Sequence, residues 1–165
     1  MHLKKHENNP ILSPNPNHDW ENEVTTNPTA WYDEKDKEVK LLYRCLGKES
    51  THVTRIALAT SKDGYNFERF DEPVFCPRQE GFDTGVVEDP RMVKIGDWYY
   101  ITYASVPFAP GKYWENGGNR YICKDLPDEF PSYMRENATV TGLAATRDFE
   151  KFYRFGRITN TLVAK

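Results

Sequence analysis

An acidic pair, a proline and an arginine lie between two apolar, β-type runs, as Glu88-Asp89-Pro90-Arg91. Proline has no backbone donor and a fixed φ, which places this group at the start or edge of a strand. Successive side chains of a strand point to opposite faces. We therefore expect Glu88 and Asp89 to diverge, and Asp89 and Arg91 to share a face, one reaching a ligand while the other orients it. A surface Asp–Arg pair at a turn is the alternative.

The neighbouring residues predict a β-hairpin that carries this group. Gly96-Asp97 is typical of a tight turn, and the aromatic run 98–103 that follows is typical of a strand. Farther along, residues 57–70 align without gaps with residues 142–155, with six identities in fourteen positions. The chain is therefore predicted to contain a repeated β-unit.

Each unit consists of a polar-proline rim, a strand, a hairpin, a strand, a loop and two further strands. Four antiparallel strands per unit are typical of a propeller blade. Asn27-Pro28 of one unit corresponds to Asp89-Pro90 of the next. The innermost strands of blades converge on the propeller axis, so we expect Asn27 and Asp89 to approach each other. We predict one all-β domain, 1–165, with blade-like units at about 20–85 and 86–160.

The second unit carries an insertion at about 106–137, rich in Pro, Gly, Tyr and Asn. A loop of this length in a compact domain is usually functional or mobile. Tyr113 and Trp114 either pack against a sugar or anchor the loop, and we favour anchoring. Two blades do not close a ring. The chain is therefore expected to be the front part of a longer propeller, a half that forms a homo-oligomer, or a half completed by partner chains.

Composition excludes several classes of function. The 165 residues carry a net charge of -3, which argues against nucleic acid or an anionic membrane surface as partner. No apolar run reaches the roughly 18 residues of a membrane-spanning helix. The basic N-terminal residues precede no apolar run, so we expect no signal peptide and favour the cytoplasm, although the compartment is not determined. The three cysteines and four histidines have no metal-ligand spacing, so we predict no metal site and no cofactor.

With these motifs in order, the chain resembles glycoside hydrolase family 130, the β-mannoside phosphorylases and related mannosidases, which are five-bladed propellers. The resemblance runs from about residue 9 to 155. It rests on the Asn27-Pro28 rim, the strand that ends at Arg44, the strand that begins at Arg55 with its Ser61-Lys62-Asp63-Gly64 tip, and above all Glu88-Asp89-Pro90-Arg91.

The resemblance implies a role for each matched residue. Asp89 would be the general acid, with its proton passing to the glycosidic oxygen through a sugar hydroxyl. Asn27, Arg44 and Arg55 would hold the mannosyl unit. Inorganic phosphate would be the co-substrate and would attack the anomeric carbon with inversion, giving mannose 1-phosphate from a β-linked manno-oligosaccharide.

We also include Arg91 among the substrate-binding candidates, because it is expected to lie on the same face of the strand as Asp89. Arg147, at the tip of the second unit, is the one phosphate-binding candidate, although a solvated loop cation is the stronger interpretation. The family's phosphate-holding cations come largely from later blades.

Three alternatives stay open. The first is a hydrolytic β-mannosidase, which would need a second carboxylate as its base, and Glu88 could not serve if it points away. The second is an inactive, carbohydrate-binding propeller fragment. The third is a five-bladed glycosidase acting on arabinose- or fructose-containing glycans. The linkage, the acceptor sugar and the oligomeric state are not determined by the sequence.

Overall fold

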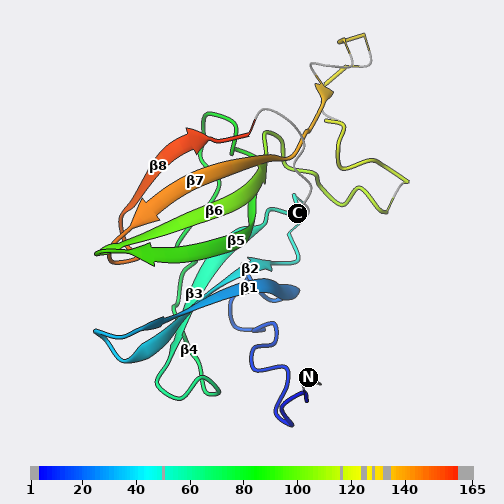
Figure 1. Cartoon of the computed structure of the whole chain (residues 1–165). Helices are drawn as coiled ribbons and strands as arrows, with labels where there is room; N and C mark the ends of the chain where they lie inside the picture. The colour runs from blue at the N-terminus through cyan, green and yellow to red at the C-terminus, as the bar shows by residue number, and fades with distance from the viewer. Residues whose placement is uncertain are drawn as a thin grey trace.

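The computed structural model describes residues 4–49, 51–115, 117–123, 126–127, 129–131 and 135–159. It shows an all-β chain of two four-stranded sheets (Figure 1). The strands are β1 (Val24–Asp33), β2 (Glu38–Leu46), β3 (Arg55–Ser61), β4 (Glu68–Arg69), β5 (Val86–Ile95), β6 (Trp98–Val106), β7 (Val140–Thr146) and β8 (Phe152–Arg157).

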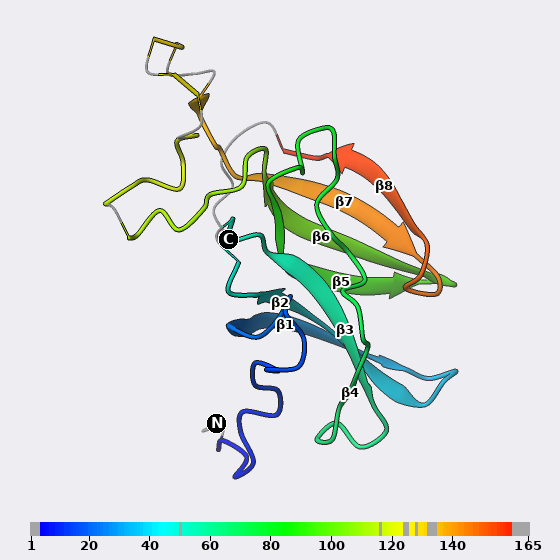
Figure 2. The same cartoon turned by 180° about the vertical axis from the view of Figure 1, so that it is seen from behind.

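Each sheet is an antiparallel meander whose order in space follows its order in the chain. The first sheet runs β1-β2-β3-β4 and the second β5-β6-β7-β8, as both faces of the molecule show (Figures 1 and 2). Gly96 and Asp97 join β5 to β6, and Gly96 has φ of 59°, a conformation that glycine adopts without steric cost. The predicted hairpin is confirmed, and so is the all-β fold with two blades of a propeller.

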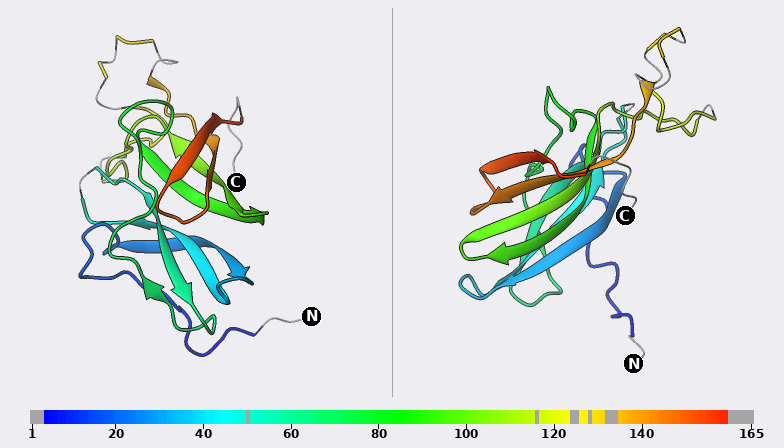
Figure 3. Two further views of the ribbon diagram at one scale, coloured as in Figure 1. Left: turned by 90° about the vertical axis from the view of Figure 1, so that its left-hand side faces the viewer. Right: turned by 45° about the horizontal axis from the view of Figure 1, so that its top comes forward.

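The core lies between the two sheets, which stack face to face (Figure 3). Alternate side chains of each strand point into this layer because the strand period is two. β5 packs against β1, β2 and β3 of the first sheet. The buried members of this layer are Leu42, Ile56, Leu58, Phe75, Val87, Met92, Tyr99, Ile101, Tyr103, Ala144 and Phe149.

The repeated tips have the same local structure. The backbone N–H of Gly64 donates to Ser61 Oγ at 2.8 Å, and the N–H of Phe149 donates to Thr146 Oγ1 at 2.9 Å. Both residues have positive φ, 77° and 61°. Within each tip, the aspartate at the third position (Asp63 or Asp148) accepts bonds from two following backbone N–H groups. These Ser/Thr-x-Asp tips are therefore turn-forming groups.

The insertion leaves the second sheet between β6 and β7 and extends away from both sheets (Figure 1). Near its start it returns to the first sheet's β2–β3 loop, where the N–H of Gly111 donates to the carbonyl of Thr51 at 3.1 Å. The ring of Trp114 lies edge-on to His52 at 4.5 Å and also contacts Tyr113. These contacts anchor the loop through Trp114, as the sequence favoured.

Across the described ranges, no helix is long and apolar enough to cross a membrane. The same part of the chain contains no cluster of three or more side chains suited to hold a metal ion. The three cysteines are free thiols, and Cys45 and Cys123 are buried.

Candidate functional site

Two equivalent β-bulges form the rims that the sequence singled out. In β1 the register shifts between Thr26 and Thr29, and in β5 it shifts between Glu88 and Arg91. In each bulge, two residues of one strand, an Asx-Pro pair, lie opposite a single tyrosine of the neighbouring strand. The extra residue bends the bulged strand. Asn27 and Asp89 have φ of 47° and 53°, in the left-handed region that Asn and Asp tolerate better than most residues.

The bulges bring together three of the predicted site residues. Asn27 Nδ2 donates to Asp89 Oδ1 at 2.6 Å, and Arg44 Nη1 lies 3.3 Å from the same oxygen. Asn27 comes from β1, Arg44 from β2 and Asp89 from β5, so the group joins both sheets. The Asp89 side chain is 19% exposed, so it remains accessible from solvent.

The expected divergence of Glu88 and Asp89 is wrong. Arg44 contacts both carboxylates, through Nη2 to Glu88 Oε2 at 3.0 Å and through Nη1 to Asp89 Oδ1 at 3.3 Å. The cause is the bulge, because a left-handed residue at position 89 interrupts the alternation of faces. Unlike Asp89, Glu88 is buried, with 5% of its surface exposed.

The expected pairing of Asp89 with Arg91 is also wrong. Arg91 follows the bulge and is exposed, and its Nη1 donates to the carbonyl of Pro90 at 2.7 Å. Arg55 does not join the described contacts of Asp89 either, because its Nη1 bonds Glu49 at 2.6 Å and the Val53 carbonyl at 3.1 Å.

Arg147 lies at the far end of the second sheet. Its guanidinium stacks over the ring of Trp98 at 4.3 Å, beside the β5–β6 turn, whereas Asp89 lies near the other end of β5. This contact is a surface cation–π pair. The structure therefore places Arg147 apart from Asn27, Arg44 and Asp89 and favours its interpretation as a loop cation.

One arginine at the site was missed by the sequence analysis. Arg120, in the insertion, places Nη2 2.9 Å from Glu88 Oε1. Its backbone carbonyl accepts from Asn137 Nδ2 at 2.9 Å, and the same buried amide bonds both the N–H and the carbonyl of Phe108 at 2.9 Å. No local pattern marks Arg120, because its position depends on how the insertion folds back.

A repeated buried triad behind the rims was also missed. Tyr43 OH and Arg69 Nη1 both donate to Glu21 Oε2, at 2.8 and 2.7 Å. In the second sheet the corresponding donors to Asp83 Oδ2 are Tyr103 OH at 2.8 Å and Arg154 Nη1 at 2.5 Å. The tyrosines are the residues opposite the two bulges. The identity of Arg69 with Arg154 in the repeat was the available signal.

Burial and hydrogen bonding shift the pKa values of this triad. Burial alone would raise the pKa of the Asp83 carboxyl, but hydrogen bonds from Arg78, Tyr103 and Arg154 outweigh it and hold that pKa below its usual value. Burial, together with the bond to Asp83, raises the pKa of Tyr103. The triad is therefore an ionised carboxylate with a neutral phenol, and it fixes the strand opposite the rim.

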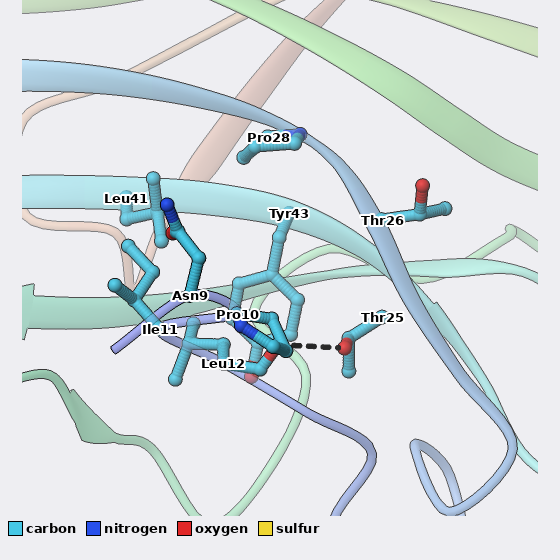
Figure 4. A pocket seen from close by; sticks show the side chains of 9 residues that line it. All are labelled: Asn9, Pro10, Ile11, Leu12, Thr25, Thr26, Pro28, Leu41 and Tyr43. Carbon is cyan, nitrogen blue, oxygen red and sulfur yellow. Dashed lines mark hydrogen bonds between the residues drawn. The ribbon is translucent and has the colours of Figure 1, made fainter. Parts of the chain in front are cut away.

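An apolar pocket of about 220 Å³ lies near the first bulge but has different chemistry (Figure 4). The N-terminal segment 9–12 covers it, over Thr25, Pro28, Leu41 and Tyr43. Its lining contains no charged side chain, so it offers nothing to hold a phosphate or to transfer a proton. The rim group of Asn27, Arg44 and Asp89 remains the candidate site.

Asp89 on β5, Asn27 on β1 and Arg44 on β2 thus form one polar group that joins two blades of a propeller protein. The family model described as beta-1,4-mannooligosaccharide phosphorylase matches residues 2–116. The chain belongs to this family, glycoside hydrolase family 130.

Relatives of known activity agree with this assignment. The chain is 37% identical over 106 residues to a 1,2-beta-oligomannan phosphorylase of Thermoanaerobacter sp. (strain X514), covering 61% of this chain and 35% of the relative. It is 39% identical over 114 residues to a beta-1,2-mannobiose phosphorylase of the same organism, covering 61% and 36%. The chain thus spans about a third of the length of these relatives.

Solved structures match the fold over nearly the whole chain. A glycosyl hydrolase from Bacteroides ovatus superposes with a TM-score of 0.67 at 23% identity, covering 94% of this chain and 41% of that one. The beta-1,2-mannobiose phosphorylase from Listeria innocua, solved as a complex with beta-1,2-mannobiose, superposes with a TM-score of 0.60 at 18% identity, covering 93% and 50%.

Proposed function

We propose that the whole protein is a β-mannoside phosphorylase, with a β-linked manno-oligosaccharide and inorganic phosphate as its substrates. The observation that carries this proposal is the convergence of Asn27, Arg44 and Asp89 across two blades, at 2.6 and 3.3 Å from one carboxylate oxygen. Family membership and relatives that act on β-1,2-linked mannosides support it.

In this proposal Asp89 supplies the proton and Asn27 and Arg44 hold the mannosyl unit. A phosphate oxygen forms a bond to the anomeric carbon from the opposite face as the bond from that carbon to the glycosidic oxygen breaks. The proton of Asp89 passes through a sugar hydroxyl to the departing oxygen, giving inverted mannose 1-phosphate and a saccharide shorter by one unit. Phosphate is already a nucleophile, so one protein carboxylate is enough.

Within this chain, Glu88 does not provide the second carboxylate that hydrolysis would need. An inverting hydrolase needs a second carboxylate that activates water across the sugar from the acid. Glu88 is adjacent in sequence, but it is buried and its two oxygens are held by Arg44 and Arg120 at 3.0 and 2.9 Å. It is therefore committed to ion pairs and is not free to act as that base.

The test is an assay of product with and without phosphate. Purified protein is incubated with β-1,2- and β-1,4-mannobiose, and mannose 1-phosphate and free mannose are measured. We expect mannose 1-phosphate that depends on phosphate. Asp89→Asn is expected to lower kcat by about 10²- to 10⁴-fold, the usual contribution of general acid catalysis.

The matched control is Asp97→Asn, an exposed aspartate at the turn of the same hairpin, which should leave kcat unchanged. Free mannose without mannose 1-phosphate would identify a hydrolase. Binding of mannobiose with no product would identify a carbohydrate-binding protein. Full activity in Asp89→Asn would refute the assignment of the acid.

A further inference from the structure

Glu88 holds two guanidinium groups, one from each side. Arg44 Nη2 lies 3.0 Å from Oε2 and Arg120 Nη2 lies 2.9 Å from Oε1. Thr54 Oγ1 is 3.4 Å from Oε2. The contact with Arg120 is a charge-assisted hydrogen bond, a kind that is shorter and stronger than a bond between neutral groups. Glu88 thus pairs with two arginines, whereas Asp89 pairs with one.

Arg44 is shared between this buried carboxylate and the proposed acid. Its other nitrogen, Nη1, lies 3.3 Å from Asp89 Oδ1. A guanidinium at this distance favours the ionised form of a carboxyl group. A general acid, however, must hold a proton at the start of the reaction. The charge of Arg44 therefore opposes the role of Asp89 unless another group offsets it.

We propose that the negative charge of Glu88 offsets the positive charge of Arg44, so that Asp89 can carry its proton. Arg120 neutralises part of the Glu88 charge and so limits this effect. Glu88 is then a positioning and charge-tuning residue rather than a catalytic one. The inference rests on the proposed role of Asp89 as general acid. It also assigns a function to the insertion, which places the guanidinium of Arg120 beside the Glu88 oxygen that Arg44 does not contact.

In the described part of the chain, the hydrogen bonds and ion pairs of Arg44 and Asp89 include no carboxylate other than Glu88 that could supply this offset. Asn27, from β1, is uncharged and donates to Asp89. Burial, reinforced by the charges of Arg44 and Arg120, lowers the pKa of His52 in the β2–β3 loop, so this histidine is uncharged at neutral pH. Arg55, at the start of β3, pairs with Glu49. On β5 itself, Arg91 donates to the Pro90 carbonyl.

Hydrogen bonds within the insertion fix the backbone position of Arg120. The side chain of Asn137 is buried and bonds the backbone at both ends of the intervening loop, at Phe108 and at Arg120. The N–H of Asn137 also donates to the carbonyl of Tyr121 at 2.7 Å. A side-chain amide with all of these partners fixes the local backbone, so the reach of Arg120 to Glu88 is set by the fold of the insertion.

The test measures the titration of Asp89 directly, by its side-chain carboxyl ¹³C signal across pH, in the wild type, Glu88→Gln and Arg120→Gln. Removing the negative charge of Glu88 should lower the titration midpoint of Asp89 by about one pH unit, since Arg44 then acts on Asp89 alone. Removing the positive charge of Arg120 should raise the midpoint. The controls, Lys112→Gln and Glu115→Gln, break an insertion ion pair at 3.6 Å and should leave the midpoint unchanged.

A midpoint that rises in Glu88→Gln would show that Glu88 only keeps Arg44 in place, and an unchanged midpoint would show no influence, so either result overturns the inference. If Glu88→Gln does not fold, Arg120→Gln decides, and its midpoint must rise. The alkaline limit of phosphorolysis should move in the same directions as the midpoints. The titration needs no turnover, so a wild type without phosphorolysis would refute the proposed function without settling this inference.

Discussion

Asp83 illustrates how a single buried residue fixes the inner strands. Its carboxylate is fully buried. Oδ2 accepts hydrogen bonds from Tyr103 and Arg154, and Oδ1 accepts one from Arg78 at 2.8 Å. Arg154 also donates to the Cys76 carbonyl at 2.5 Å and stacks on Phe75. The triad therefore ties β8 and β6 to the loop that enters β5, behind the bulge that carries Asp89.

We predict that Arg154→Met lowers the free energy of unfolding by about 3 kcal/mol, because removing one partner of a buried ion pair leaves its charge poorly compensated. Urea denaturation at pH 7 measures this. Arg69→Met, at the equivalent position beside Glu21, should behave alike. Arg157→Met, at an exposed position on β8, should have little effect. A loss below about 1 kcal/mol for both Arg154→Met and Arg69→Met would contradict a structural role for the triads.

At the scale of elements, the two bulges determine what meets at the rim. Each adds an Asx-Pro pair opposite a tyrosine, Tyr43 or Tyr103, and each puts its Asx residue at positive φ. Without these bulges, strict alternation would send neighbouring side chains to opposite faces. The bulges therefore decide that Asn27 reaches Asp89 and that Arg44 spans both acids.

We predict that Asn27→Val destabilises the protein by about 2 kcal/mol, because a β-branched residue is strained at φ of 47°. Asn27→Gly should cost much less, since glycine adopts this conformation freely and loses only the side-chain bonds to Asp89 and Thr26. Chemical denaturation of the two variants gives the comparison. Thr25→Val, in the same strand without positive φ, is the control. Equal losses for Val and Gly would show that the amide, and not the backbone, matters.

How far the sequence predicts this structure depends on how local each feature is. The hairpin at Gly96-Asp97 and the repeated strands were predictable, because turn chemistry and alternation are local. The approach of Asn27 to Asp89 followed from the repeat. The partners of Glu88 could not be predicted from the alternation of side chains along a strand, because the left-handed conformation of Asp89 interrupts that alternation. Arg120 could not be found, since its place depends on contacts made by Asn137 across the insertion.

At the scale of the molecule, the outer face of the second sheet exposes apolar side chains that no other described segment covers. Its outward side chains include Val93, Ile95, Tyr153 and Phe155, which are between 44% and 63% exposed. The first sheet's outer face is instead covered in part by the N-terminal segment, whose Leu12 and Trp20 pack near Tyr43. A bare apolar sheet face is what a blade presents to its neighbour in a propeller. This matches a chain that spans about a third of its relatives.

The two sheets are also joined by an ionic link at their hairpin ends. Asp33, which ends β1, is buried and bonds Lys94 Nζ of β5 at 2.5 Å and the hydroxyl of Tyr99 of β6. Burial alone would raise the pKa of Asp33, but the bonds from Lys94 and from the backbone N–H groups of Asp36 and Lys35 outweigh it and lower that pKa. The link thus stabilises the stacked pair of blades when Asp33 is ionised.

We therefore predict that Asp33→Asn lowers the free energy of unfolding by about 2 kcal/mol at pH 7, since a charge-assisted bond between the sheets is lost. A carboxyl whose folded pKa is lowered contributes its stability above its unfolded pKa, near 3.9, and loses it as pH falls through the folded value. The gap between wild type and variant should accordingly shrink below about pH 4. Urea titrations at pH 7 and pH 3 measure it. Asp97→Asn, exposed on the neighbouring hairpin, should show no such gap, and a gap for Asp33→Asn that stays constant across pH would contradict an ionic link.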